Sequence, residues 1–164
     1  MTRAVLSIGS NLGDREANLR IAVEVLWDWL RAISPVYETK PWGVEDQPDF
    51  LNAVLIVDDP AADEWTWLHR AQSAEHHAGR VRTRHWGPRT LDVDIVTVDG
   101  VTSDHPDLRL PHPGAHERAT VLAPWLDIEP HAGLPGHGLV RELLAGTDTS
   151  GLRKRDDLRL VGTA

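Results

Sequence analysis

The amino-acid sequence predicts one α+β domain, with a mainly antiparallel sheet and helices packed on it in layers. Segments with strand patterns and segments with helix patterns alternate irregularly along the 164 residues, and long loops join some of them. A doubly wound parallel sheet would instead show regular alternation of strands and helices. Hydrophobic residues make up 41% of the chain and charged residues 26%, which is typical of a globular domain. No linker or internal repeat divides residues 1–164, so we expect a single domain.

Charge and cysteine content exclude several classes of function. The formal net charge is −8, which argues against a general binder of nucleic acid or of an anionic membrane surface. Cysteine is absent, so disulfides, thiolate nucleophiles and cysteine-based zinc sites are excluded. The apolar run at residues 4–8 is too short for a signal peptide, and no run approaches membrane-spanning length. We therefore expect a cytoplasmic protein without nucleic-acid or membrane partners.

The N-terminal region predicts a strand, a turn and a helix. Residues 4–8 are typical of a short buried strand, and residues 9–14 form a glycine-containing loop that ends in Asp14, a good helix N-cap. This loop lacks the lysine and hydroxyl of a phosphate-binding P-loop. Apolar residues then recur every three or four positions over residues 15–33, which predicts an amphipathic helix that Pro35 stops.

A long loop is predicted at residues 39–52, because this segment contains two prolines, a glycine and several acids. Trp42 and Phe50 give the loop two aromatic side chains, and the Asn52 amide can both donate and accept hydrogen bonds. The aromatic residues either anchor the loop to the core or face a ligand, and the sequence leaves both alternatives open. Residues 53–57 then predict a strand.

Two further helices are predicted. The first covers residues 63–78 and places Gln72 and Glu75, three positions apart, on one face near its C-terminal end. The second is short and covers residues 140–144. The charged run at residues 153–157 predicts a solvated tail.

A strand with two acidic residues follows the helix predicted at residues 63–78. Residues 91–95 read L-D-V-D-I and alternate strictly, so Asp92 and Asp94 project together from one face while the apolar residues face the core. Two adjacent carboxylates suit a hard cation such as Mg²⁺, which leaves room for phosphate oxygens. The alternative is that these acids are only the solvated face of an edge strand.

Four arginines precede this strand within ten residues that contain no acid. They are Arg80, Arg82, Arg84 and Arg89, and Trp86 stands in a stiff Trp-Gly-Pro turn among them. Guanidinium groups bind phosphate oxygens in a forked geometry. Alone, the arginines are also compatible with a solvated loop or a nucleic-acid contact. Together with the two acids they favour a phosphoryl-transfer site.

A turn rich in proline and histidine begins at residue 110. His112 and His116 have the spacing of a helical zinc pair, but the Pro-Gly pair between them prevents a helix there, and no third ligand presents itself. A rigid Pro-His-Pro turn that leads into a helix, with Arg118 close behind it, favours a phosphate contact instead.

Four separated blocks follow one another in the order found in a known enzyme family. They read S-I-G-S-N-L-G-D; P-W-G-V-E-D-Q-P-D-F-L-N-A-V; G-R-V-R followed by W-G-P-R-T-L-D-V-D-I; and L-P-H-P followed by R-A-T-V-L-A-P-W. Over roughly residues 5–130 the chain resembles the 6-hydroxymethyl-7,8-dihydropterin pyrophosphokinases of folate biosynthesis. The resemblance implies a ferredoxin-like α+β fold and an ATP-dependent diphosphokinase. Such an enzyme transfers pyrophosphate from ATP to 6-hydroxymethyl-7,8-dihydropterin and releases AMP.

The resemblance also implies the catalytic residues. Asp92 and Asp94 correspond to the ligands of two Mg²⁺ ions that bridge the triphosphate of ATP. Arg80 and Arg82 correspond to residues of the family's catalytic loop, and Arg89 stands at the far end of that loop. No residue stands out as a general base.

Two groups of binding residues follow from the same resemblance. The nucleotide site is expected to contain Gln72, Glu75, Trp86, Arg89, His112 and Arg118. The pterin pocket is expected to contain Thr39, Trp42, Phe50 and Asn52. In this pocket Phe50 would stack on the flat heterocycle, and Asn52 would bind its hydrogen-bonding edge.

Two departures from the family pattern affect these expectations. Thr120 stands where family members usually carry an aromatic residue, which predicts weaker stacking on the pterin. The catalytic loop is also one residue shorter than in some relatives. Two other functions stay open: a protein that binds ATP and pterin without turnover, and a metal-dependent phosphohydrolase that uses the same acids. We expect a monomer whose partners are the two small-molecule substrates.

Overall fold

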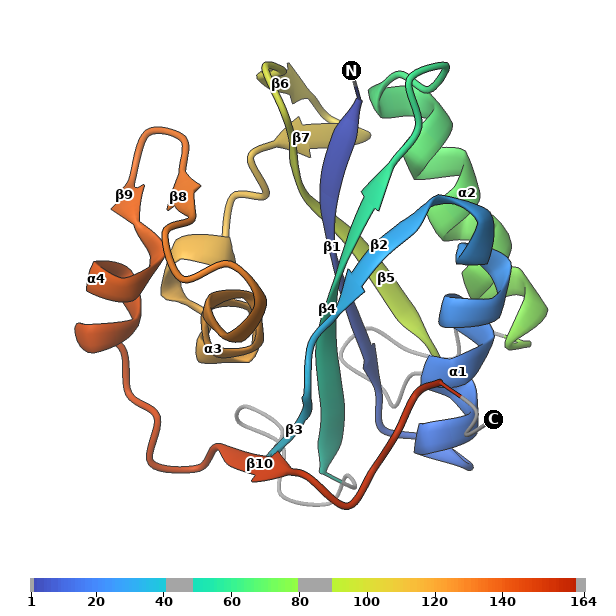
Figure 1. The fold of residues 1–164 in the computed structure, drawn as a ribbon, viewed down its shortest axis with the longest axis vertical. Coiled ribbons are helices and arrows are strands. Elements are labelled where there is room, and N and C mark those ends of the chain that lie inside the picture. The colour runs from blue at the N-terminus through green and yellow to red at the C-terminus, as the bar shows by residue number, and fades with distance from the viewer. Residues whose placement is uncertain (1, 41–48, 80–89, 162–164) are drawn as a thin grey trace.

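The computed structural model describes residues 2–40, 49–79 and 90–161, which form a central sheet with helices on both faces (Figure 1). The strands of this sheet are β1 (Arg3–Ser10), β2 (Leu30–Ile33), β3 (Val36–Thr39), β4 (Phe50–Asp58), β5 (Asp92–Val98) and β10 (Arg153–Arg155). The helices are α1 (Arg15–Val25), η1 (Trp27–Trp29), α2 (Glu64–His77), η2 (Ala115–Glu117), α3 (Ala119–Ile128) and α4 (Val140–Ala145), where η marks a 3₁₀ helix. Two small hairpins pair β6 (Ser103–His105) with β7 (Leu108–Leu110), and β8 (Gly133–Leu134) with β9 (Gly138–Leu139).

The central sheet has the strand order β10-β3-β4-β1-β5, and β2 pairs with β4 beside β3. Every pairing between these strands is antiparallel. The chain runs from β1 through α1 to the strands β2–β4, and then through α2 to β5, which is the ferredoxin-like order of elements. The predicted α+β class with a mainly antiparallel sheet is therefore confirmed.

Alternating side chains of the strands divide the core into two clusters. One cluster lies between the sheet and the helices α1 and α2, around the fully buried Trp67 of α2. The other lies on the opposite face, where Val5, Val54 and Val96 from three strands join Trp125 of α3. Figure 1 shows α1 and α2 on one side of the sheet and α3 and α4 on the other. The face under α3 also carries polar residues, among them Asn52 and Asp92.

The first helix is shorter than its apolar spacing predicts. α1 ends at Val25, the next turn is η1, and the chain then enters β2, which pairs with β4. Leu30 and Ile33 continue the apolar spacing, but they do so from a strand whose pairing overrides the helical pattern. Pro35 separates β2 from β3 and does not end a helix. The Ser34 hydroxyl bridges this break, because it accepts a hydrogen bond from the Val54 N–H at 2.8 Å.

Two strands are longer than the sequence predicts. β1 extends through Gly9 to Ser10, into the predicted glycine loop, and β4 begins at Phe50, inside the predicted long loop. The extra residues pair with one another, since Gly9 lies opposite Asn52 and Ser10 opposite Leu51. Long-range pairing thus converts both loop ends into sheet, and it places Phe50 and Asn52 on a strand.

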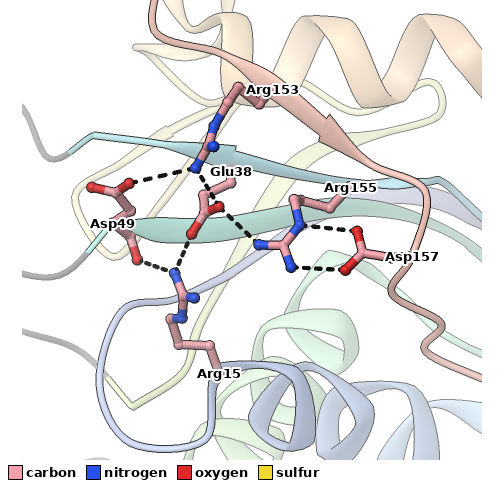
Figure 2. Close-up of polar contacts among 6 residues, drawn as sticks. All are labelled: Arg15, Glu38, Asp49, Arg153, Arg155 and Asp157. Atoms are coloured by element: carbon pink, nitrogen blue, oxygen red, sulfur yellow. Dashed lines mark hydrogen bonds and ion pairs between the residues drawn. The ribbon is translucent and has the colours of Figure 1, made fainter.

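The charged run at residues 153–157 is largely exposed, as predicted, but part of it also forms regular structure. Residues Arg153–Arg155 form β10, which pairs with β3 at the outer edge of the sheet (Figures 1 and 2). Arg153 and Arg155 both bind the carboxylate of Glu38. The charged run therefore has a structural partner that lies more than a hundred residues earlier in the chain.

Helices α2 and α4 lie where the sequence predicts helices. Asp63 caps α2 through the Thr66 N–H at 2.8 Å, and Gly79 follows this helix with a φ of 71°. The short helix predicted at residues 140–144 is α4. Within the described ranges, no helix has both the length and the apolar character needed to cross a membrane.

Candidate active site

The two candidate metal-binding carboxylates lie on β5, on the face of the sheet that α3 covers. Val93 is buried beneath α1 and α2, so Asp92 and Asp94 on either side of it lie on the opposite face, where both are partly exposed. In the register with β1, Asp92 lies opposite Gly9 and Asp94 opposite Ser7. This is the alternation that the sequence predicts.

The chemistry of this pair fits Mg²⁺. Mg²⁺ is bound in proteins by one or two carboxylates, and phosphate oxygens and water fill its remaining positions. Among the residues that the structure describes, no group of three or more His, Cys, Asp or Glu side chains could enclose a metal ion. Two carboxylates on a strand therefore suit an ion that binds together with a phosphate ligand.

Glu75 of α2 lies beside the start of this strand. Its Oε2 accepts a hydrogen bond from the Val93 N–H at 3.0 Å, which fixes β5 to α2 between the two aspartates. Gln72, one turn earlier, is exposed. Glu75 thus contacts the carboxylate strand directly, and the contact of Gln72 and Glu75 with nucleotide stays a prediction.

The Pro-His-Pro turn lies directly beside β5. The His112 N–H donates a hydrogen bond to the Val96 carbonyl at 2.8 Å, after a cis peptide bond between Leu110 and Pro111. The turn leads through η2 to Arg118, the residue before α3, whose exposed guanidinium folds back over Gly114. The predicted helix after the turn is confirmed, and it begins at Ala119.

The charge state of His112 depends on its neighbours. Burial lowers its pKa below the ordinary value, the positive charge of Arg118 lowers it further, and the carboxylate of Asp92 opposes both effects. The ring Nδ1 lies 3.2 Å from the Gly114 N–H and accepts its hydrogen, so the proton of the neutral ring belongs on Nε2. His112 therefore offers one N–H donor, and its electrostatic contacts place it near both Arg118 and Asp92.

Three residues predicted for the pterin pocket share one end of the sheet. Thr39 of β3 pairs with Phe50 of β4, and Asn52 follows two positions later on the same face of β4. Thr39 and Phe50 are partly exposed, whereas Asn52 is buried. The structure thus brings an aromatic face and an amide together on the α3 side of the sheet.

Asn52 has an unusual environment for a buried side chain. Its Nδ2 has no hydrogen-bond partner within the described part of the chain, although a buried unpaired amide costs about 1–3 kcal/mol. Gly9 lies opposite Asn52, and a Cβ at that glycine would stand 2.8 Å from the Asn52 Oδ1. Gly9 therefore leaves the space that the amide occupies. A glycine inside a strand signals such close approach, but the local sequence predicts a loop at Gly9, so this role is not apparent before the strand pairing is known.

The register brings the two halves of the site together. Asn52, Gly9 and Asp92 stand side by side on β4, β1 and β5. Because adjacent strands are about 4.8 Å apart, the amide and the carboxylate belong to positions about 10 Å apart on one face.

Five predicted site residues lie outside the described residues: Trp42, Arg80, Arg82, Trp86 and Arg89.

This combination defines a class of protein. A ferredoxin-like α+β domain that presents paired carboxylates beside an imidazole and a guanidinium has the groups of a metal-dependent phosphoryl-transfer enzyme. Residues 5–130 match the family model described as 7,8-dihydro-6-hydroxymethylpterin-pyrophosphokinase, and the chain belongs to that family. The family predicted from the four sequence blocks is confirmed, and with it the predicted transfer of pyrophosphate from ATP to the hydroxymethyldihydropterin in folate biosynthesis.

Curated relatives agree with this assignment along nearly the whole chain. The 2-amino-4-hydroxy-6-hydroxymethyldihydropteridine pyrophosphokinase of Mycobacterium leprae is 54% identical over 175 residues, which cover 98% of this chain and 90% of the relative. The protein of the same name from Mycobacterium tuberculosis is 49% identical over 172 residues, with the same shares covered. That of Methylorubrum extorquens is 42% identical over 158 residues, which cover 94% of this chain and 99% of the relative.

Solved structures show the same fold at low sequence identity. The wild-type HPPK-DHPS of Plasmodium falciparum, in a crystal structure with SDX-DHP, superposes with a TM-score of 0.67 at 14% identity over 94% of this chain. The chain spans about half the length of that protein, since the match covers 47% of it. This likeness supports the fold alone.

Proposed function

We propose that this chain transfers the pyrophosphoryl group of ATP to the hydroxymethyl group of the pterin on the α3 side of the sheet, where β4, β1 and β5 lie side by side. The observation that carries the proposal is the row formed by Asn52, Gly9 and Asp92 on three adjacent strands. A group that recognises a heterocycle and a group that binds a metal–phosphate complex are then neighbours on one surface. Two substrates held there would meet between them.

The pterin would bind between β3, β4 and α3. Phe50 offers a flat apolar face for stacking, with Thr39 beside it. The Asn52 amide, whose Nδ2 lacks a protein partner among the described residues, would donate a hydrogen bond to the heterocycle. Substrate binding would then offset the cost of the buried amide. Trp42 keeps the pocket role that the resemblance implies.

The triphosphate of ATP would lie along β5 and the turn before α3. We assign Asp92 and Asp94 to two Mg²⁺ ions, which when bound would offset the charge of the phosphate oxygens and orient the triphosphate. The Nε2–H of His112 and the guanidinium of Arg118 would donate to phosphate oxygens from the opposite side. Glu75, which holds the backbone of β5, would keep the two carboxylates in position, and Gln72 would line the same region.

The remaining positive charge would come from the arginine-rich segment. Arg80, Arg82 and Arg89, with Trp86 among them, keep the catalytic and nucleotide-binding roles implied by the sequence blocks. Their guanidinium groups would stabilise charge that develops on the transferred group. No described residue is assigned as a general base, and the reaction depends on alignment and electrostatics. We propose that the chain acts as a monomer in the cytoplasm.

One incubation tests the reaction. The protein is mixed with Mg²⁺, ATP and 6-hydroxymethyl-7,8-dihydropterin, and AMP, ADP and the pterin product are separated. We expect AMP that forms only with pterin, abolished by Asp94→Ala and retained by Asp104→Ala, which removes an exposed carboxylate on β6. ADP, or hydrolysis without pterin, would instead indicate a phosphohydrolase. ATP and pterin binding without turnover would indicate a binding protein.

A further inference from the structure

A charged cluster lies at the edge of the sheet where β3, β10 and the start of α1 meet (Figure 2). Glu38 of β3 is only 5% exposed, and its carboxylate accepts hydrogen bonds from three guanidinium groups. Nη1 of Arg15 lies 2.7 Å from Oε2, Nη2 of Arg153 lies 2.6 Å from Oε1, and Nη1 of Arg155 lies 2.8 Å from Oε1. These four residues are called the Glu38 cluster below.

The Glu38 cluster is held together by ionised partners. Burial by itself would raise the pKa of Glu38, but the hydrogen bonds from Arg15 and Arg155 outweigh it and hold the pKa below its ordinary value. Asp157 binds Arg155 through both carboxylate oxygens, at 2.8 and 3.0 Å. Hydrogen bonds between ionised groups are about twice as strong as neutral ones. The cluster therefore fixes the relative positions of the segments that contribute to it.

Arg15 joins two strand ends at the pterin pocket. The same Nη1 that binds Glu38 also donates to the Asp49 carbonyl at 2.8 Å. Glu38 immediately precedes Thr39 at the end of β3, and Asp49 immediately precedes Phe50 at the start of β4. The Arg15 guanidinium thus links Glu38 to Asp49, the residues next to Thr39 and Phe50. Thr39 and Phe50 form the last residue pair between β3 and β4.

The C-terminal strand holds β3 from both faces. On the face toward α1, Arg153 and Arg155 of β10 bind Glu38. On the face toward α3, Nζ of Lys154 lies 3.2 Å from Oδ2 of Asp127, and the same oxygen accepts the hydroxyl proton of Tyr37. β10 lies beyond residue 130, where the match to the family model ends. A segment outside the matched region therefore supports a strand that carries a proposed substrate contact.

We propose that Arg15 is a positioning residue for the pterin substrate, and that β10 acts with it through the Glu38 cluster. The inference rests on the proposed pterin pocket, because the residues positioned are Thr39 and Phe50. The cluster stands three strands away from Asp92 and Asp94 in the order β3-β4-β1-β5. Loss of the cluster should therefore weaken use of the pterin and leave use of ATP unchanged.

The test is steady-state AMP formation with each substrate varied in turn. Arg15→Met is expected to raise the KM for pterin about tenfold, while kcat and the KM for ATP stay within about twofold. Arg15→Lys, which keeps the charge and a donor, should recover part of the loss. Arg20→Met is the matched control, because Arg20 lies on the same helix but binds Glu16 and the Arg159 carbonyl. It should change neither KM.

A second variant keeps the inference testable if Arg15→Met does not fold. Arg153→Met removes a partner of Glu38 whose side chain is 66% exposed, and it should also raise the KM for pterin selectively. An unchanged pterin KM, or an equal rise for both substrates in folded Arg15→Met and Arg153→Met, would overturn the inference. If the wild type forms no pterin-dependent AMP, the proposed function falls and the inference falls with it. If the wild type turns over but Phe50→Ala leaves the pterin KM unchanged, the function stands and the inference falls.

Discussion

Two regions of the same sheet carry acidic side chains in opposite electrostatic settings. On β5, Asp92 and Asp94 are partly exposed and project side by side from one face. On β3, Glu38 is buried and has three arginine partners. The first arrangement concentrates negative charge that a cation can offset, whereas the second is neutralised within the protein. We therefore infer that the carboxylates on β5 serve a ligand, whereas the contacts of the carboxylate on β3 are structural.

The largest effect is expected at β5. Asp94→Asn keeps the shape of the side chain and removes the charge, so it should lower kcat roughly 10³-fold, because metal-assisted charge stabilisation supplies several kcal/mol. The free energy of unfolding should change by less than about 1 kcal/mol, since the side chain is partly exposed. Activity assays and urea titration measure the two quantities. A large loss of stability would contradict a ligand-binding role.

The reverse pattern is expected at β3. Glu38→Gln leaves three guanidinium groups without an anionic partner and should lower the free energy of unfolding by roughly 2–3 kcal/mol, while kcat at saturating substrate changes little. Asp157→Asn is the control, because Asp157 is 63% exposed and its ion pair with Arg155 should contribute less than about 1 kcal/mol. Equal losses in the two variants would show that the buried carboxylate has no special role.

The pH dependence of stability distinguishes the wild type from Glu38→Gln. The pKa of Glu38 is lowered in the folded protein, so its contribution to stability is complete above its ordinary pKa. That contribution is lost as the pH falls from the ordinary pKa through the lowered one. Urea titrations between pH 3 and 7 should show a steeper acid loss in the wild type than in Glu38→Gln. If the free energy of unfolding falls with pH in parallel for the two proteins, this prediction is wrong.

The β5 region is predictable from sequence because its information is local. The alternation of residues 91–95 sets both the buried side and the carboxylate side, and the strand needs no distant partner to be recognised. The helix around Glu75 and the turn at His112 are predictable for the same reason, from an apolar stripe and from prolines. The four sequence blocks shared with the family also predict that these segments belong to one site.

The β3 region is not predictable because its partners are far apart in sequence. Glu38 and Arg155 stand 117 positions apart, and nothing in the charged tail indicates a buried partner. Strand pairing likewise ends α1 early and draws Phe50 into β4, since backbone hydrogen bonds between distant segments override local patterns. Gly9 is a partial exception, because a glycine within an apolar run can signal close approach of another side chain.

Gly9 offers a way to disturb the pterin side without touching a charge. A Cβ at this position would stand 2.8 Å from the Asn52 Oδ1, so Gly9→Ala should displace the amide and raise the KM for pterin about tenfold. The matched test introduces Gly9→Ala into the Asn52→Ala variant. In that background Gly9→Ala should change the KM for pterin less than twofold, because the amide that it would displace is absent. Additive effects in the double variant would show that Gly9 acts by another route.

The smallest effect is expected at Thr120, in the first turn of α3, where the family resemblance predicts an aromatic residue. Thr120 is partly exposed, whereas the adjacent Val121 packs into the core, so a larger side chain at 120 can extend toward solvent. Aromatic stacking contributes about 0.5–1.5 kcal/mol beyond burial, so Thr120→Phe should tighten pterin binding about two- to tenfold in calorimetric titrations. Thr120→Val, which nearly keeps the shape of threonine and adds no aromatic ring, should leave the affinity unchanged. If folded Thr120→Phe binds pterin no better than the wild type, a stacking face is not missing at this position, and the weaker stacking predicted from the sequence is wrong.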